Sequence, residues 1–237
     1  MKQDTPLLVL ENLSIGYNAV LASEINASIH AGEVIAVLGP SGIGKTTLVR
    51  TIAGLVEPID GKVELHVDKR GGLGYIPQKL GLVRHASVYH NVNLGARASL
   101  PVLNGGSEER KKRVNSALVA LGIEEKTTEP VRRLSGGQLR RVATARALAQ
   151  QPSLLLADEF LSELDHNTVD VVVAAVKNLL DAGTAMIMVE HHEENVSLLA
   201  TRVWVIEDEK FHDLSIDEWK AKTPLVIDEA HFGGEEE

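Results

Sequence analysis

A nine-residue segment, residues 39–47, constrains the fold most because it reads Gly-Pro-Ser-Gly-Ile-Gly-Lys-Thr-Thr. It fits the phosphate-binding pattern G-x-x-x-x-G-K-[ST] at every fixed position. An apolar run typical of a strand, residues 34–38, precedes it, and a run typical of a helix, residues 47–53, follows it. Glycines let the backbone pass close to phosphate with its N–H groups turned inward, and the helix N-terminus adds a positive dipole end. The segment is therefore predicted to be a phosphate loop between a strand and a helix.

The side chains of this loop have separate predicted roles. Lys45 is expected to reach the β- and γ-phosphates of a nucleotide, and the Thr46 hydroxyl is expected to bind Mg²⁺. The alternative is a glycine-rich turn with a surface lysine, which the flanking strand and helix patterns disfavour. The other predicted nucleotide-binding residues of the loop are Gly39, Ser41, Gly42, Gly44 and Thr47.

The composition limits the available partners and chemistry. The chain has 237 residues, enough for one α/β domain with a sizeable core. Its 24 basic and 33 acidic side chains give a net charge of −9, which argues against binding along a nucleic-acid backbone. The absence of cysteine excludes disulfides, thiolate metal sites and a cysteine nucleophile. No apolar run approaches the roughly 18 residues of a membrane span and no secretory signal is evident, so we expect a soluble chain without direct membrane insertion.

Alternating strand and helix patterns predict an α/β chain. Strand patterns lie at about residues 7–17, 27–29, 34–38, 62–67, 154–157, 185–189 and 202–206. Helix patterns lie at about residues 47–53, 107–121, 137–150 and 168–182, and a capping box of Ser215 and Glu218 begins a short last helix.

The distribution of these patterns predicts the organisation of the chain. Two helix patterns follow each other in the middle, which indicates an inserted α-helical subdomain at about residues 87–149. The core would then comprise about residues 1–86 and 150–237, ending in an acidic tail at about residues 233–237. We expect a P-loop NTPase core with a mostly parallel sheet and an N-terminal antiparallel β part, all within one domain.

Further motifs follow the phosphate loop in a characteristic order. Residues 134–138 read Leu-Ser-Gly-Gly-Gln, and a later apolar run ends in Asp158-Glu159. Asp165 closes the segment Leu-Ser-Glu-Leu-Asp, and His191 follows the strand pattern at residues 185–189. This order resembles the ATP-binding-cassette (ABC) ATPase family over nearly the whole chain. The segment at residues 134–138, called the signature below, is very specific for that family when it lies between a phosphate loop and an apolar run ending in Asp-Glu.

The resemblance implies a catalytic set beside the phosphate loop. Asp158 is similar to the acidic residue that helps to hold Mg²⁺, and it would emerge at the carboxyl end of a buried strand. Glu159 matches the general base for the attacking water, a role worth roughly 10²–10⁴-fold in rate. Gln78 matches the glutamine that contacts Mg²⁺ or the lytic water, and His191 matches the histidine that contacts the γ-phosphate. Taken alone, each of these side chains has an ordinary alternative as a turn, surface or strand-end residue.

One further match and three departures complete the comparison with the family pattern. Tyr17 is similar to the aromatic residue that stacks on adenine, and its alternative is a tyrosine that ends a strand. Glu163 stands where a small residue is usual, in the loop after the base that also carries Asp165. Glu190 stands where threonine is common, and His192 stands where aspartate is frequent.

The signature residues have an implied role in a second subunit. Ser135, Gly136, Gly137 and Gln138 are implied to bind the γ-phosphate of an ATP held by that subunit, because a glycine-rich turn that opens a helix forms an anion site. Two cassettes, identical or related, would then bury two ATP molecules between them. ATP binding would close this dimer and loss of the γ-phosphate would open it.

The expected function is ATP binding and hydrolysis that powers transport of an unidentified substrate across a membrane. ATP and Mg²⁺ are the expected cofactors, and transmembrane subunits of a transporter are the expected partners, contacted partly through residues 80–94. The chain is then expected at the cytoplasmic face of the cell membrane, as a peripheral subunit. One alternative is a soluble ABC ATPase of DNA repair or translation, which usually has a long coiled coil or tandem cassettes. Another P-loop enzyme, such as a kinase, is disfavoured by the signature.

The Lys45→Ala substitution is expected to abolish ATP binding. It removes the one fixed positive side chain of the phosphate loop, where lysine acts as a point charge on the phosphates. Calorimetric titration with ATP checks this expectation, and an unchanged affinity of the variant would contradict it.

Overall fold

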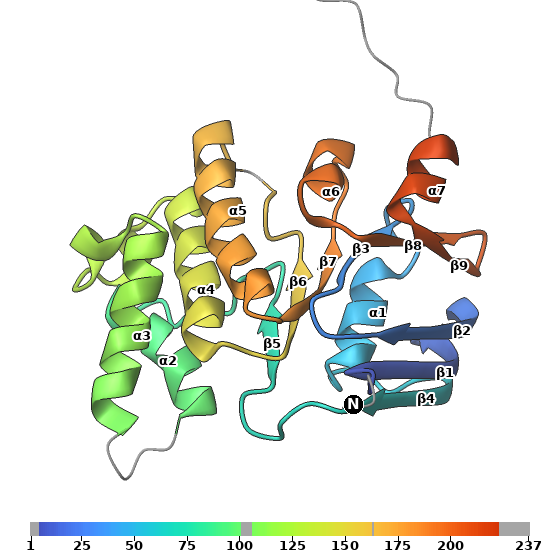
Figure 1. The fold of residues 1–237 in the computed structure, drawn as a ribbon, viewed down its shortest axis with the longest axis horizontal. Coiled ribbons are helices and arrows are strands. Elements are labelled where there is room, and N and C mark those ends of the chain that lie inside the picture. The colour runs from blue at the N-terminus through green and yellow to red at the C-terminus, as the bar shows by residue number, and fades with distance from the viewer. Residues whose placement is uncertain (1–4, 101–105, 163, 223–237) are drawn as a thin grey trace, which may run out of the picture.

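The computed structural model describes residues 5–100, 106–162 and 164–222 (Figure 1). Its strands are β1 (Leu8–Gly16), β2 (Val20–Ile29), β3 (Val34–Leu38), β4 (Asp60–Leu65), β5 (Leu73–Ile76), β6 (Leu154–Asp158), β7 (Ala185–Val189), β8 (Arg202–Glu207) and β9 (Lys210–Ser215). Its helices are α1 (Lys45–Ile52), α2 (Val88–Ser99), α3 (Gly106–Ala120), α4 (Gly136–Gln150), α5 (His166–Asp181), α6 (Glu193–Leu199) and α7 (Ile216–Lys222). Two short 3₁₀ turns lie at Glu124–Lys126 and Val131–Arg133.

The strands form two sheets with α1 between them. The larger sheet has the order β5-β6-β7-β3-β8-β9, in which only the β8–β9 pair is antiparallel. The smaller sheet has the order β2-β1-β4 and is antiparallel throughout. The buried side chains of α1 join one apolar core with side chains from both sheets (Figure 1). This arrangement confirms the predicted α/β class with a mostly parallel sheet and an N-terminal antiparallel part.

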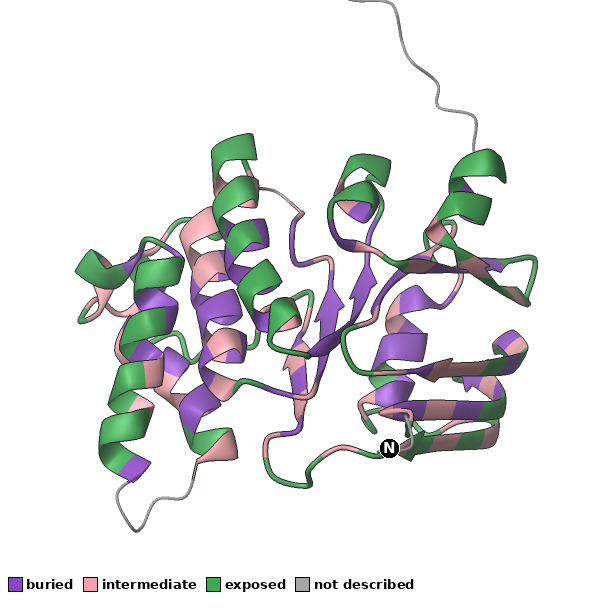
Figure 2. Cartoon of the chain, viewed as in Figure 1, coloured by how far each residue is buried: buried purple, intermediate pink, exposed green. Residues whose placement is uncertain are grey.

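The central strands of the larger sheet are buried on both faces. Side chains alternate along β7, so Met186 and Met188 enter one core while Ile187 and Val189 enter the other. Figure 2 shows β6 and β7 buried along their length. Strands of this kind carry polar side chains only where they end, because both of their faces are apolar. The polar groups that follow these strands are therefore gathered at the carboxyl edge of the sheet.

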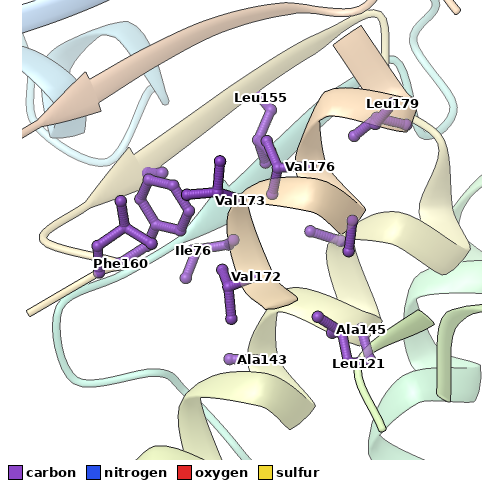
Figure 3. Packing of buried hydrophobic residues seen from close by; sticks show 14 of the residues in the cluster. Ile76, Leu121, Ala143, Ala145, Leu155, Phe160, Val172, Val173, Val176 and Leu179 are labelled. Carbon is purple, nitrogen blue, oxygen red and sulfur yellow. The ribbon is translucent and has the colours of Figure 1, made fainter. Parts of the chain in front are cut away.

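Helices α2, α3 and α4 pack against one another, and α5 lies beside α4 (Figure 1). Figure 3 shows how α5 packs near the sheet, with Val172, Val173 and Val176 close to Ile76 and Leu155. The same apolar cluster contains side chains of α2, α3 and α4. This continuous packing connects α4, whose first turn contains Gly136, Gly137 and Gln138, to the strands that end at the carboxyl edge.

Several elements differ from the sequence-based expectations. The structure contains α2, α6, β5 and β9, which the patterns did not predict, and β2 is longer than the predicted strand. Gly95 weakens the helix pattern of α2, but a Cβ there would lie 1.9 Å from the main-chain oxygen of Arg146, so close helix packing requires the glycine. The turn before β9 consists of Asp208 and Glu209, which adopt positive φ angles of 48° and 64°. It contains no glycine that would mark a turn in the sequence.

Some predictions fall beyond the structural description or remain predictions. The acidic tail at residues 233–237 and Glu163 lie outside the described residues. The limits of a helical subdomain at residues 87–149 stay a prediction. The capping box is confirmed, because Glu218 N–H donates to Ser215 Oγ at 3.2 Å and Ser215 N–H donates to Glu218 Oε2 at 2.8 Å. Within the described ranges, each helix is too short or too polar to cross a lipid bilayer.

The Leu156→Ala substitution is expected to lower the free energy of unfolding by about 2–5 kcal/mol, the usual cost of truncating a buried leucine. Leu156 lies in the middle of β6 and is fully buried. Urea denaturation measures the change. Leu55→Ala is the matched control, because Leu55 is 60% exposed and its truncation should cost less than about 0.5 kcal/mol. Equal losses in the two variants would contradict the assignment of β6 to the core.

Candidate nucleotide-binding site

A polar cavity of about 220 Å³ opens at the carboxyl edge of the larger sheet. The loop between β3 and α1 and the first turn of α1 form one part of its lining, with Ser41, Gly42, Gly44, Lys45, Thr46 and Thr47. The remaining lining residues are Gln78, Glu159 and His191, which follow β5, β6 and β7. Four parallel strands thus bring together side chains that are far apart in the sequence. Ligands of open α/β sheets bind at this edge.

The phosphate loop has the backbone that its glycines predict. Gly39, Gly42 and Gly44 have φ angles of 143°, 80° and 117°, which side chains rarely tolerate. At Gly39 there is also no room, because a Cβ would lie 2.3 Å from the main-chain oxygen of Ile206. The loop therefore needs glycine here for conformation and for close packing against β8.

Lys45 is held at the loop by main-chain oxygens. Its Nζ donates to the oxygens of Gly39 at 2.7 Å and Pro40 at 2.9 Å. Burial lowers the pKa of Lys45 from its ordinary value, although the charges of Glu159 and Asp158 act in the opposite direction. The cation thus lines the cavity, where it would attract an anionic ligand.

Thr46 and Asp158 form an oxygen pair that fits a divalent cation. Thr46 Oγ1 donates to Asp158 Oδ1 at 3.1 Å, and Asp158 Oδ2 is buried with no hydrogen-bond partner among the described residues. Asp158 is 1% exposed, and burial raises its pKa from the ordinary value. A hydroxyl and a carboxylate beside an anion cavity are the ligands that Mg²⁺ takes in phosphate sites. Thr46 lines the cavity and Asp158 does not, so the carboxylate lies behind the hydroxyl.

Both carboxylate oxygens of Glu159 take part in hydrogen bonds. Gln78 Nε2 donates to Oε2 at 2.9 Å, and His191 Nε2 lies 3.0 Å from Oε1, where its N–H donates. Partial burial acts to raise the pKa of Glu159, but the hydrogen bonds from His191 and Gln78 outweigh it, so this pKa lies below its ordinary value. The three predicted catalytic residues are therefore in direct contact at the cavity, with the carboxylate kept ionised.

Glu190, one of the departures from the family pattern, anchors the loop that carries His191. Its side chain is 2% exposed, and burial raises its pKa from the ordinary value. Its Oε2 accepts from the His191 N–H and from Asn195 Nδ2 of α6, both at 3.3 Å. The carboxylate thus ties the end of β7 to the next helix. His192, the other departure in this loop, is the N-cap of α6, and its main-chain oxygen accepts from the N–H groups of Asn195 at 3.1 Å and Val196 at 3.3 Å.

Tyr17 lies away from the cavity. It directly follows β1, is 60% exposed, and its hydroxyl accepts from Arg50 Nη1 at 3.4 Å. Its ring is therefore accessible for stacking. Nothing in the described part of the chain brings it into the lining of the cavity.

The signature residues and Asp165 also lie outside the cavity. Ser135 is the N-cap of α4 and forms a capping box with Gln138, and Gly136 and Gly137 begin the helix. Asp165 is the N-cap of α5, where it accepts from the N–H of Thr168 at 2.9 Å. Within the described ranges, none of these residues lines the cavity. Within one copy of the chain, the signature residues therefore do not share the cavity that the phosphate loop lines.

Two arginines contact the site loops although the sequence patterns predicted no role for them. Arg140 and Arg146 of α4 donate to main-chain oxygens of the loops that carry Glu159 and Gln78. Their only signal in the sequence is their place in a helix that is otherwise rich in small apolar residues. Such a helix is expected to be buried, and a buried guanidinium needs acceptors.

The comparisons with known proteins agree with this geometry. The family model described as ABC transporter matches residues 22–162. A relative in Salmonella paratyphi A, named a putative 2-aminoethylphosphonate import ATP-binding protein PhnT, is 34% identical over 221 residues. That alignment covers 87% of this chain and 58% of the relative, so the chain spans little more than half of the relative's length.

Two solved structures share the fold along most of the chain. The first is cbiO1 from Clostridium perfringens, part of the ABC transporter complex cbiONQ, with a TM-score of 0.77, 29% identity, and coverage of 92% of this chain and 91% of that chain. The second is the ATP-binding cassette MJ0796 in a dimeric post-hydrolysis state bound to ADP and Pi, with a TM-score of 0.79, 27% identity, and coverage of 88% and 98%. Because the family model covers more than half of the chain, and Lys45, Glu159 and His191 line one cavity as the family pattern implies, the chain belongs to the ABC transporter family.

Proposed function

We propose that this chain is the subunit that hydrolyses ATP to move a solute across a membrane, together with separate membrane-spanning subunits. The observation that carries the proposal is the Glu159 carboxylate, which is bonded to Gln78 and His191 beside the phosphate loop. Import is the favoured direction, because the PhnT relative is named for import. A role in DNA repair or translation finds no support in the relatives described above.

The chain's own residues account for binding of the phosphates. The inward N–H groups of the glycine loop and the Lys45 ammonium attract the β- and γ-phosphates. Thr46, Asp158 and Gln78 would hold Mg²⁺, which neutralises charge on these phosphates when it is bound. Tyr17 provides an exposed ring on which the adenine stacks.

Hydrolysis then requires a proton acceptor for the attacking water. Glu159 takes one proton from this water while the water oxygen forms a bond to the γ-phosphorus. The bond between that phosphorus and the bridging oxygen breaks, and ADP and phosphate result. The pKa of Glu159 is held low by His191 and Gln78, so the carboxylate is in its proton-accepting form at neutral pH. His191 also orients the carboxylate and is placed to contact the γ-phosphate.

A second cassette would complete each site. Ser135, Gly136, Gly137 and Gln138 lie outside the chain's own cavity, at the N-terminus of α4. The capping box uses the N–H groups of Ser135 and Gln138, so those of Gly136 and Gly137 would face the γ-phosphate held by a partner. Asp165 lies in the loop that would face this partner. The dimeric state of the MJ0796 cassette supports this arrangement. Closure driven by ATP and opening after hydrolysis would then perform mechanical work.

The membrane-spanning partners would contact the surface next to Gln78. Residues 80–94 comprise a loop and the first half of α2, and Ser87 caps this helix by accepting from the N–H of His90. If nucleotide binding moved Gln78, the neighbouring residues 80–94 would move with it. The occurrence of cbiO1 in the cbiONQ transporter complex supports such an assembly. The chain would then be peripheral, at the cytoplasmic face of the membrane.

The Glu159→Gln variant is expected to bind Mg-ATP and to hydrolyse it roughly 10²–10⁴-fold more slowly, the usual value of a general base. The amide keeps the size of the carboxylate but does not readily accept a proton. ATP should then stay trapped between two closed chains. ATP turnover and size-exclusion chromatography with ATP measure the two effects.

A double variant provides the matched control for this experiment. Ser135→Arg combined with Glu159→Gln should bind ATP as a monomer and form no ATP-dependent dimer, because the arginine would fill the partner's phosphate site. Turnover near the normal rate by Glu159→Gln would refute Glu159 as the base. If His191→Ala alone then abolished turnover, the histidine would carry that role.

The ionisation of Glu159 is a separate prediction. Its ¹³C carboxyl signal should titrate below the ordinary glutamate pKa, because His191 and Gln78 donate to the charged form. In Gln78→Ala or His191→Ala, one donor is lost and the pKa of Glu159 should rise. NMR titration measures these shifts, with Glu159→Gln as the control that identifies the signal. An unshifted signal in both alanine variants would contradict the bonded geometry.

A further inference from the structure

Helix α4 donates side-chain hydrogen bonds to main-chain oxygens at four turns that contain a positive φ. At each turn, at least one bond runs from an arginine or glutamine of α4 to a residue in the left-handed region, where the backbone is strained unless the residue is glycine. The pairs are Arg140 with Glu159, Arg141 with Gly122, Arg146 with Leu80 and Gly81, and Gln150 with Gly71. Glu159 and Leu80 are the acceptors without a glycine's freedom.

The bond from Arg140 reaches the residue proposed as the base. Arg140 is 7% exposed, and its Nη1 donates to the main-chain oxygen of Glu159 at 2.7 Å. The same oxygen accepts from Ser162 twice, from the N–H at 3.2 Å and from Oγ at 2.9 Å. Three donors therefore converge on one oxygen, and the guanidinium makes the shortest and charge-assisted bond.

The Glu159 backbone needs such support. Its φ of 53° is uncommon for a residue with a Cβ, and a strained conformation persists only where the surroundings over-determine it. The orientation of its carbonyl sets ψ, and together with φ this fixes the direction in which the side chain leaves the backbone. Fixing the oxygen thus fixes where the carboxylate points. Arg140 itself does not line the cavity.

We propose that Arg140 is a positioning residue for ATP hydrolysis. Its guanidinium holds the main-chain oxygen of Glu159, and the left-handed backbone so fixed aims the carboxylate between Gln78 and His191. This inference rests on the proposed role of Glu159 as the base. Arg140 acts through Glu159 and does not touch the substrate.

Arg140→Met tests the proposal because it removes the donor while keeping an unbranched side chain of similar helix propensity. The Glu159 oxygen keeps both Ser162 donors, so this acceptor stays paired and the variant is expected to fold. Its kcat should fall by about tenfold to a hundredfold, the usual effect of a lost positioning contact, with KM for ATP changed less than about twofold. Arg140→Lys retains a cationic donor and should recover most of the rate.

The decisive measurement repeats Arg140→Met in the Glu159→Gln background. If Arg140 acts through the carboxylate, its loss should change the residual rate less than about threefold there. Gln150→Met is the matched control, since it removes bonds from the same helix to the oxygens of Gly71 and Leu73, remote from the cavity. Its effect on the rate should be small and equal in the two backgrounds.

The outcomes separate the two proposals. An equal rate loss by Arg140→Met in both backgrounds, or no loss in either, overturns the positioning role and leaves Glu159 as the base. A normal rate of Glu159→Gln overturns both. If Arg140→Met does not fold, Ser162→Ala replaces it, because it removes another donor to the same oxygen. Its expected loss is roughly threefold, confined to the chain with Glu159, and a loss present in both backgrounds again overturns the proposal.

Discussion

The burial of parallel strands on both faces is the constraint on which the rest of the structure depends. Alternate side chains of β6 and β7 enter the two apolar cores, so these strands have no exposed face for a polar group. Asp158, Glu159 and Glu190 therefore stand where the strands end. The parallel register then carries these groups to one edge, beside the phosphate loop that follows β3. Apolar packing of the strands thus brings several ionisable groups together at one edge of the sheet.

Burial and pairing act against each other among the charges at this edge. Burial raises the pKa of Asp158 and of Glu190 and lowers that of Lys45, so each of these charges is costly where it lies. Glu159, less buried and bonded to Gln78 and His191, is the carboxylate whose pKa is lowered. Two adjacent carboxylates in one sequence motif are thus electrostatically different, which suits their different proposed roles at a cation and at a water.

Backbone conformation connects the site to the helical part of the chain. Glu159 and Leu80 adopt positive φ angles of 53° and 58° without being glycine, and both accept hydrogen bonds from arginines of α4. Helix α4, which Ser135 caps, is therefore hydrogen-bonded to the two loops that carry Glu159 and Gln78. A displacement of α4 at its N-terminus would therefore be transmitted to the loop of the proposed base through these hydrogen bonds, although the signature residues lie outside the cavity.

The sequence by itself determined the phosphate loop, the α/β class and most of the residues that meet at the cavity. Motif spacing suffices for these, because Lys45 and Glu159 lie at fixed offsets from strands with strong apolar patterns. Only the tertiary structure revealed helix α2. Its Gly95 weakens the helix pattern in the sequence, and the reason for this glycine is the close contact with α4. The structure alone also related Arg140 to Glu159 and Glu190 to Asn195. Such bonds depend on how helices pack against loops, and local sequence patterns do not encode this packing.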